Sequence, residues 1–305
     1  MGNLVGRRGK SKSVLIVGRH SYVANRISDH FKNIKIKTDF LSHSGDFYTN
    51  NKVVNNLFNN KNKNSFKYSY IINCAGPDRE FCLKHPLEGI KRRKQIIYKI
   101  CDMLDYGLAE NVLHFSSIHV FSGINSGNQI PKPFACPNDP YGFSHILAEN
   151  LLIENLSQKK YEKNFTIFRL PNLFGHSKKM LGNSLGLFGN QIINMACEGL
   201  VRLKAKTNNA INLFPLGLLC KILEKEYLES NFLGQTINLY PERPTKILDY
   251  LKKINKYTEF FLESNISDET PNYPNYISDI KYNNFDCSFD NEVYETFLFF
   301  QKKCK

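Results

Sequence analysis

The chain has 305 residues, 42% of them hydrophobic, and carries a formal net charge of +13. This length can bury a core in one large domain, or in a large domain and a small one. No run approaches the roughly 18 consecutive apolar residues of a transmembrane helix, which excludes a membrane-spanning protein, and the positive charge favours anionic partners.

The first twelve residues are expected to be a disordered basic leader, because they contain four Lys or Arg residues and no apolar signal segment. Gly6 stands where an N-myristoylation signal has Ser or Thr. The eight cysteines show no Cys-x-x-Cys spacing, which predicts reduced thiols in a cytoplasmic protein and no metal site. They are Cys74, Cys82, Cys101, Cys136, Cys197, Cys220, Cys287 and Cys304.

The first ordered segment, Ser13–Gly18, is a short apolar run that ends in glycine and predicts a buried strand. An amphipathic helix is expected from Tyr22 to about Lys32. Further strands are predicted at 34–39, 68–75, 111–116 and 165–170, and helices at 52–58, 91–104 and 141–156. Strands that alternate with helices indicate βαβ units, so residues 13–175 are predicted to form an α/β domain with a doubly wound parallel sheet.

Beyond Gly175 the alternation breaks down. Helices are predicted at 187–199 and 216–228, with a third entered at 244–251, and strands at 210–214 and 236–240. We expect residues 176–305 to form a smaller α/β lobe, some of whose strands return to the main domain. The last thirty or so residues give no clear signal.

The turn after the first strand reads Gly18-Arg-His-Ser21-Tyr-Val-Ala24. A phosphate cradle needs a glycine at the turn, small residues beside the pyrophosphate and an open helix N-terminus. Only the first glycine of a Gly-x-x-Gly-x-x-Gly pattern is present, although Ser21 and Ala24 are small. The turn therefore predicts a dinucleotide site with Gly18, Arg19, Ser21, Tyr22 and Val23, and the alternative is a retained fold with an empty site.

Two residues bear on which dinucleotide would bind. Asp39 lies 21 residues after Gly18, at the expected end of the second strand, where a carboxylate accepts from a ribose 2′-hydroxyl and favours NAD. Arg19 could instead pair with the 2′-phosphate of NADP. The prediction is NAD or NADP, with a slight lean to NAD.

Three segments further along the chain carry a family resemblance. They are Ser116-Ser-Ile-His-Val-Phe-Ser122, Tyr141-Gly-Phe-Ser-His145 and Arg169-Leu-Pro-Asn-Leu-Phe-Gly175. Together they resemble the signature of the extended short-chain dehydrogenase/reductases, also called the NAD-dependent epimerase/dehydratase family. Over about residues 13–255 the chain looks most like sugar-nucleotide 4-ketoreductases of the dTDP-4-dehydrorhamnose reductase type. The resemblance implies a Rossmann-like domain and a substrate-binding C-terminal lobe.

The same resemblance implies catalytic roles. Ser117 would orient the substrate oxygen and Tyr141 would exchange its proton, while the motif's lysine, which also holds the nicotinamide ribose, is replaced by His145. A unit charge about 5 Å away lowers a phenol's pKa of about 10 by about two units at a dielectric constant near 20. His145, with a reference pKa near 6.5, is mostly neutral at pH 7. Three outcomes stay open: activity with a protonated His145, slow or low-pH activity, or binding without turnover.

Further cofactor and substrate contacts are implied by the resemblance. Asp46 and Phe47 would bracket adenine, and His119 could be a second acid/base paired with His176, against the alternative of a hydrogen-bonded structural histidine. No Asp-Glu pair follows Ser117, which argues against a 4,6-dehydratase. The remaining expected contacts are Cys74, Ala75, Gly76, Leu170, Pro171 and Leu173 with the cofactor, and Asn172 with the substrate.

Two functional hypotheses follow. The first is an NAD(P)-dependent reductase or epimerase that acts on a nucleotide-activated sugar in surface polysaccharide biosynthesis, with a possible homodimer formed through the tyrosine-bearing helix. The second is a catalytically degenerate relative that binds nucleotide or RNA without redox turnover. The depleted glycine turn, His145 and the net charge of +13 favour the second. The retained Ser117, Tyr141 and Asn172 favour the first.

Overall fold

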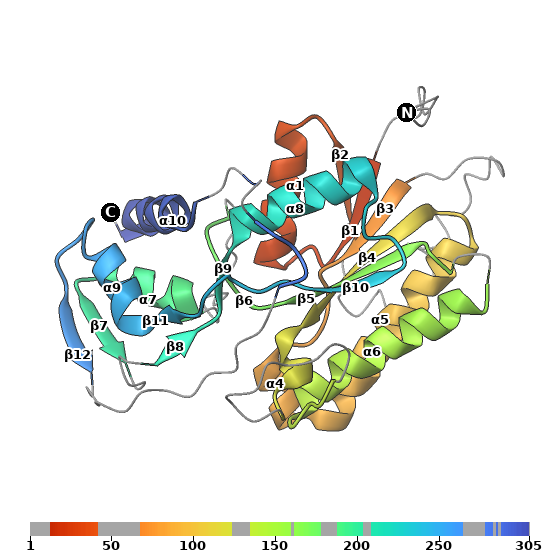
Figure 1. Ribbon diagram of the computed structural model, residues 1–305, viewed down its shortest axis with the longest axis horizontal. Coiled ribbons are helices and arrows are strands. Elements are labelled where there is room, and N and C mark those ends of the chain that lie inside the picture. The colour runs from red at the N-terminus through yellow and green to blue at the C-terminus, as the bar shows by residue number, and fades with distance from the viewer. Residues whose placement is uncertain are drawn as a thin grey trace.

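A six-stranded parallel sheet forms the centre of the larger part of the molecule (Figure 1). The computed structural model describes residues 13–41, 68–123, 135–159, 162–177, 188–203, 209–264, 278–282, 285 and 288–304. Within these ranges no helix combines the length and the apolar character needed to cross a bilayer. The expected leader 1–12, the expected helix 52–58, Asp46 and Phe47 lie outside the described residues.

The strand order is β10-β5-β4-β3-β1-β2, and every neighbouring pair is parallel. This doubly wound arrangement confirms the predicted α/β, Rossmann-like fold class. The strands are β1 (Ser13–Val17), β2 (Lys37–Leu41), β3 (Tyr68–Asn73), β4 (Ala109–Ser117), β5 (Phe165–Leu170) and β10 (Gln235–Asn238).

The second strand begins and ends later than expected. Lys35 has a φ of 62°, a left-handed conformation that ends the turn after the first helix. The strand therefore starts at Lys37 and ends at Leu41. The expectation that Asp39 ends this strand is wrong, because Asp39 is the middle residue, paired in register with Leu15.

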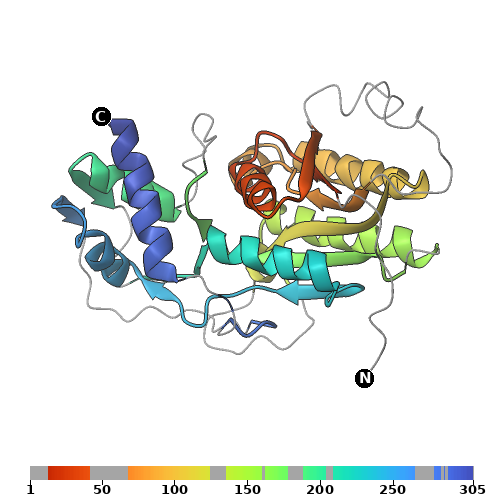
Figure 2. The ribbon, with the colours of Figure 1, turned by 90° about the horizontal axis from the view of Figure 1, so that it is seen from above.

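Helices cover both faces of the sheet (Figures 1 and 2). Helices α5 (Pro86–Asp105) and α6 (Pro140–Ser157) pack together over one face, where Ile96, Ile100 and Leu152 are fully buried. Helices α1 (Tyr22–Asn33) and α8 (Leu216–Glu229) pack side by side over the other, around Ile27 and Leu219. A short helix that the sequence analysis did not predict, α4 (Arg79–Lys84), precedes α5.

The smaller lobe contains the remaining elements. Helix α10 packs against α7 and α9, and the aromatic rings of Phe174, Tyr250 and Phe289 meet in the core of this lobe. Asn212 divides the single strand expected at 210–214 into two short ones. The elements are β6 (Asn172–Phe174), α7 (Phe188–Cys197), β7 (Leu200–Leu203), β8 (Ala210–Ile211), β9 (Leu213–Pro215), β11 (Thr245–Lys246), α9 (Ile247–Ile254), β12 (Phe261–Ser264) and α10 (Phe289–Cys304).

Because all six strands are parallel, the turns that leave β1, β3, β4 and β5 meet at one edge of the sheet. Two helices begin at that edge with side-chain caps: Ser21 Oγ accepts from the Ala24 amide at 3.4 Å, and Asp139 Oδ1 accepts from the Gly142 amide at 2.7 Å. Ligands of open parallel sheets bind outside the carboxyl ends of the strands. We therefore expect the ligand site of this fold at this edge of the sheet.

Candidate functional site

A cavity of about 490 Å³ opens at the carboxyl edge of the sheet. This volume lies within the range of small-molecule sites. Its walls come from the start of α1, the exits of β3, β4 and β5, and the first turns of α6. The lining residues are Ser21, Tyr22, Val23, Cys74, Ala75, Gly76, Pro77, Asp78, Arg79, Arg93, Phe115, Ser116, Ser117, Ile118, His119, Tyr141, His145, Leu170, Pro171, Asn172 and Leu173.

Most of the residues selected from the sequence meet in this one cavity. They are Ser21, Tyr22, Val23, Cys74, Ala75, Gly76, Ser117, His119, Tyr141, His145, Leu170, Pro171, Asn172 and Leu173. Gly18, Arg19, Asp39 and His176 are not among the lining residues. The segments that follow four strands, β1, β3, β4 and β5, therefore line one cavity, as the spacing of the motifs predicted.

Gly18 shapes the turn at the base of the cavity. Its φ is 105°, and a Cβ at this position would lie 3.0 Å from the backbone of Cys74 and Ala75. The Gly18 amide donates to the Leu41 carbonyl at 3.0 Å, which joins the turn to the end of β2. A side chain would separate the first helix from the exit of β3, so glycine keeps the helix N-terminus at the cavity. Arg19, next in the turn, is exposed.

Asp39 does not face this cavity. Its carboxylate accepts a hydrogen bond of 2.8 Å from the Tyr68 hydroxyl and lies 3.9 Å from Lys37 Nζ. Because the strand continues for two residues beyond Asp39, the structure removes the argument that made this carboxylate a ribose ligand. The lean to NAD rested on that argument, so the geometry leaves NAD and NADP equal.

Ser117 and Tyr141 face each other across the cavity. Ser117 ends β4, Tyr141 lies in the first turn of α6, and both side chains line the cavity. The close approach depends on Gly142, where a Cβ would lie 2.2 Å from the His119 carbonyl oxygen. Burial raises the pKa of Tyr141, while Arg93 and the Ser117 hydroxyl act to lower it. The arrangement places a phenol and an aliphatic hydroxyl in the same cavity.

His145 is buried in the wall of the cavity. The residue is 4% exposed, and within the described part of the chain neither ring nitrogen has a hydrogen-bond partner. Burial first, then the charge of Arg93, lowers its pKa well below the usual value. The lowered pKa disfavours the alternative in which a protonated His145 assists Tyr141, and the three outcomes for His145 stay predictions. A buried imidazole with both nitrogens orphaned in a cavity wall is suited to hydrogen-bond a ligand's hydroxyl groups.

Arg93 is the site residue that the sequence analysis missed. It is 3% exposed, and its guanidinium carbon lies 5.4 Å from the centre of the Tyr141 ring. Its position gave a signal: Arg93 lies three and four residues before Ile96 and Ile97, on the buried face of an amphipathic helix. The flanking residues Lys91, Arg92 and Lys94 are exposed, as basic runs on helices usually are.

His119 lies on a short 3₁₀ turn (Ile118–Phe121) rather than on the strand, because β4 ends at Ser117. Its ring meets the Tyr141 ring edge-on at 5.4 Å, and Nδ1 is 3.8 Å from Asp139 Oδ2. Burial lowers its pKa, against the opposing effect of Asp139. The proposed partner His176 lies elsewhere, so the two histidines do not form a pair in one site.

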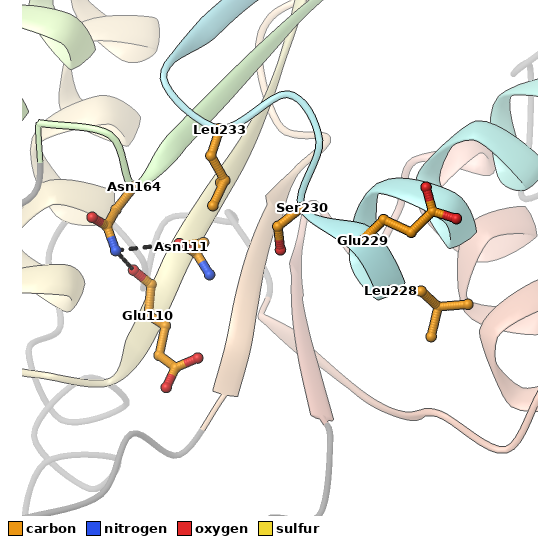
Figure 3. Close-up of a pocket in the computed structure, with 7 residues that line it drawn as sticks. All are labelled: Glu110, Asn111, Asn164, Leu228, Glu229, Ser230 and Leu233. Carbon is orange, nitrogen blue, oxygen red and sulfur yellow. Dashed lines mark hydrogen bonds between the residues drawn. The ribbon is translucent and has the colours of Figure 1, made fainter. Parts of the chain in front are cut away.

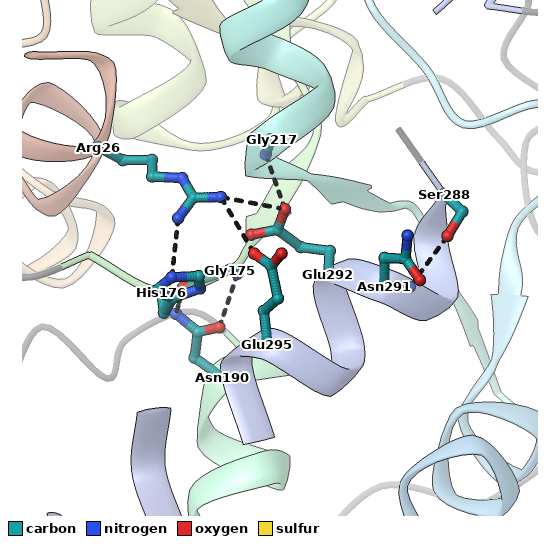
Figure 4. A network of polar contacts seen from close by, with 9 residues as sticks. All are labelled: Arg26, Gly175, His176, Asn190, Gly217, Ser288, Asn291, Glu292 and Glu295. Carbon is teal, nitrogen blue, oxygen red and sulfur yellow. Dashed lines mark hydrogen bonds and ion pairs between the residues drawn. The ribbon is translucent and has the colours of Figure 1, made fainter. Parts of the chain in front are cut away.

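His176 belongs to a polar network between the two lobes (Figure 4). Its Nε2 lies 2.9 Å from Arg26 Nη1 on α1, and its ring packs against Phe299 on α10. Arg26 also lies 3.7 Å from Glu292 and 3.6 Å from Glu295. Burial raises the pKa of Glu292 to about 7. The network joins α1 to α10 outside the cavity.

A buried ion pair supports the cavity from below. Arg169 on β5 binds both carboxylate oxygens of Glu149 on α6, with distances from 2.7 to 3.2 Å, and Ser116 also donates to Glu149. Glu149 lies four residues after His145 and eight after Tyr141, on the same face of α6. The pair therefore fixes the orientation of the helix that presents both site residues.

A second hollow, of about 510 Å³, lies at the opposite, amino edge of the sheet (Figure 3). Asn164 donates to Glu110 O and Asn111 Oδ1, at 2.9 and 3.2 Å. The carboxylates of Glu110 and Glu229 point in different directions in Figure 3. The lining residues are Glu110, Asn111, Asn164, Leu228, Glu229, Ser230 and Leu233.

Fold and site together define a class: a Rossmann-like protein with a Ser–Tyr pair in the ligand cavity at the carboxyl edge of the sheet. The sequence profile of the NAD dependent epimerase/dehydratase family matches residues 14–202, more than half of the chain, and the chain belongs to this family. No curated protein sequence matches it.

Solved structures support the same fold. UDP-glucose 4-epimerase from Thermotoga maritima has a TM-score of 0.74 at 12% identity, covering 96% of this chain and 100% of its own. L-threonine dehydrogenase from Phytophthora infestans has a TM-score of 0.76 at 15% identity, covering 96% and 100%. A dTDP-4-dehydrorhamnose reductase from Clostridium acetobutylicum has a TM-score of 0.62 at 18% identity, covering 87% and 88%.

Proposed function

We propose that the protein is a nicotinamide dinucleotide-dependent oxidoreductase or epimerase of nucleotide-activated sugars, with its reaction centre at Ser117 and Tyr141. The observation that carries this proposal is that both side chains line one cavity at the carboxyl ends of the strands, where the Ser117 hydroxyl acts on the Tyr141 phenol. A phenol that can transfer a proton, together with a second hydroxyl in the same cavity, is the arrangement that carbonyl–alcohol interconversion needs.

The chain's own residues fit a bound dinucleotide. The first turn of α1 presents Ser21, Tyr22 and Val23 to the cavity, where backbone amides suit a pyrophosphate. Ala75 and Gly76 leave room beside the ring and ribose, and the orphaned nitrogens of His145 match ribose hydroxyls. Leu170, Pro171 and Leu173 supply an apolar wall. When bound, the nicotinamide ring supplies the acceptor or donor of a hydride.

Proton transfer falls to Tyr141 in this proposal. In the oxidation direction its phenolate oxygen takes the hydroxyl proton of the substrate while the carbon's hydrogen leaves with its electron pair, and reduction reverses both transfers. Ser117 donates a hydrogen bond to the reacting oxygen and orients it. His119, at the edge of the cavity beside Asp139 and Arg79, contacts the sugar, as does Asn172. Neutral His145 serves as a ribose ligand.

The substrate class rests on the charge and the resemblance. A net charge of +13 favours a ligand that carries a diphosphate, and the motifs from Ser116 to Gly175 resemble those of sugar-nucleotide enzymes. The name of L-threonine dehydrogenase, which shares the fold, gives the nearest competing substrate class. Fold alone does not decide between them.

Two measurements test the proposal. Titration of the purified protein with NADH and NADPH, followed by cofactor fluorescence, is expected to give saturable binding of at least one dinucleotide. A panel of UDP-, dTDP- and GDP-sugars beside L-threonine, assayed in both directions, is expected to show turnover with a nucleotide sugar. Absence of dinucleotide binding would contradict the proposal, and binding without turnover of any sugar would support the degenerate alternative. Turnover of L-threonine alone would replace the substrate class.

A further inference from the structure

We infer that Arg93, on a neighbouring helix, supplies the positive charge that stabilises the Tyr141 phenolate, a task for which His145 is unsuited. The inference deepens the proposed function and rests on it. Arg93 would act through Tyr141 and is therefore a positioning residue rather than a catalytic one.

The need for a cation follows from elementary chemistry. A phenol with a pKa near 10 is a poor base at neutral pH, and burial removes the water that would solvate its anion. Burial at the cavity wall raises the pKa of Tyr141 further. A phenolate that accepts a substrate proton must therefore be compensated by a nearby charge.

His145 does not meet this need. It follows Tyr141 by one helical turn, and the two rings meet edge-on at 4.6 Å. Its pKa is lowered by burial and by three neighbouring groups, Arg93, His114 and His119. His114 is itself neutral, because burial lowers its pKa to about 3. The pKa values of all three imidazoles are thus lowered, which disfavours their charged forms.

Arg93 has the geometry for the task. Its Nε donates to Ser144 Oγ at 2.9 Å and its Nη2 to the Pro77 carbonyl at 2.8 Å, so both ends of the guanidinium are fixed. Ser144 Oγ in turn donates to the Tyr141 carbonyl at 2.7 Å. The guanidinium carbon lies 5.4 Å from the Tyr141 ring centre, a cation–π distance.

Arg93 also reaches the cofactor side of the cavity. A Cβ on Gly76 would lie 2.4 Å from Arg93 Nη1, so the guanidinium lies directly against the Gly76 backbone. Arg93 is a lining residue of the cavity although it is 3% exposed. Because arginine stays protonated at all accessible pH values, its charge persists where an imidazole's does not.

The other groups that act on Tyr141 do not supply this charge. Asp78, before α4, and Cys82, on α4, both act to raise its pKa, whereas Ser117 lowers it through a neutral hydrogen bond. Arg79 at the cavity's edge is paired with Asp139 at 3.0 Å. Among the described residues, Arg93 is the cation in contact with the Tyr141 ring.

The first test compares Arg93→Gln with Arg92→Gln. Arg92 is the adjacent residue, exposed and paired with Glu88 at 2.9 Å, so both variants lose one charge from the same helix. Arg93→Gln is expected to lower turnover about 10-fold to 100-fold near neutral pH and to move the rising, acid-side limb of the oxidation profile to higher pH. Arg92→Gln is expected to change neither. Equal profiles for the two variants overturn the inference.

A rescue experiment tests the charge rather than the fold. His145→Lys in the Arg93→Gln background returns a cation to the Tyr141 ring and is expected to restore most of the lost turnover. In the wild-type background the same change places two cations together and is expected to give a smaller gain in turnover. An equal gain in both backgrounds means that the two sites are not coupled and overturns the inference. Arg93→Lys, which keeps the charge, is expected to retain the wild-type pH profile.

A readout without turnover separates this inference from the proposed function. Arg93 lowers the pKa of His145, so its removal is expected to raise that pKa in the protein without ligands, observed by NMR titration of the imidazole resonances. His145→Gln assigns the resonance, and Arg92→Gln is the control. An unchanged His145 titration in folded Arg93→Gln overturns the inference. Failure of NADH and NADPH to bind the wild type, with the expected titration, rejects only the proposed function.

Discussion

Two hollows of nearly equal size lie at opposite edges of one sheet, about 490 Å³ at the carboxyl edge and about 510 Å³ at the amino edge. The amino-edge hollow is lined by amides, a serine, two leucines and two carboxylates that point apart (Figure 3). The carboxyl-edge cavity gathers Tyr141, three side chains that shift its pKa, and two helix starts. The two volumes do not show which hollow binds a ligand. The direction of the parallel strands does, because ligands of such sheets bind at the carboxyl ends of the strands.

The largest test of this comparison is Tyr141→Phe. Loss of the phenol oxygen is expected to reduce turnover about 10²–10⁴-fold, the usual contribution of a proton-transfer group, with little change in dinucleotide affinity. Steady-state kinetics and a binding titration measure the two quantities. Tyr98→Phe, at an exposed tyrosine on α5, is the matched control. A Tyr141→Phe protein with near-normal turnover would mean that the carboxyl-edge cavity is not the reaction centre.

The second prediction contrasts a buried ion pair in the middle of α6 with an exposed one just after the helix ends. Glu149→Ala leaves Arg169 buried without its partner and is expected to cost about 3–5 kcal/mol of unfolding free energy. Lys159→Ala removes the partner of Asp105 at the amino-edge end, where both side chains are over one-third exposed, and is expected to cost about 0–1 kcal/mol. Urea unfolding measures both. Similar losses of unfolding free energy would show that the buried Arg169–Glu149 pair stabilises the fold no more than the exposed pair does.

The third prediction concerns the junction between the lobes (Figure 4). Glu292 has a folded pKa of about 7 against an ordinary value of 4.5, so the folded state holds the proton more tightly than the unfolded state. Its contribution is therefore fully present below pH 4.5 and is lost as pH rises to about 7, a change of about 3 kcal/mol. Urea unfolding across this window is expected to show the loss in wild type and its absence in Glu292→Gln. The same dependence of unfolding free energy on pH in wild type and in Glu292→Gln would contradict the raised pKa of Glu292.

The smallest expected effect comes from the amino-edge hollow. Glu229→Gln removes a charge from its lining and is expected to change dinucleotide affinity by no more than about 2-fold, as for a surface substitution remote from a site. The cofactor-fluorescence titration that tests the proposed function measures it. A larger loss would place a ligand at the wrong edge of the sheet for this class of fold.

The parallel sheet and the assembly of the cavity could be predicted from the sequence. Buried strands and amphipathic helices follow from periodicity alone, and the spacing of Ser117, Tyr141 and Asn172 anticipated their convergence because each follows a strand end or begins a helix. Sequence patterns are strong here because the elements are long and regular.

Three features could not be predicted, each for a physical reason. Lys35 adopts a left-handed conformation that delays β2, and a period of two cannot reveal such a shift, so Asp39 was misplaced. Helix α10 follows a segment rich in Asn and Pro, and this hid the spacing of its apolar positions Val293, Phe297 and Phe300. Arg93 was missed because burial of a charged side chain depends on tertiary partners, here Ser144 and Pro77.

The position of β10 has a consequence for how this protein can be divided. The chain passes through the smaller lobe before Gln235–Asn238 returns to pair with β5, and α8 covers α1 on the same face. A fragment that stopped at Leu203 would leave the edge of β5 without its hydrogen-bonding neighbour and the apolar face of α1 open to water. Elements of the smaller lobe lie on both sides of β10 in the chain, so no single cut separates this lobe from the six-stranded sheet.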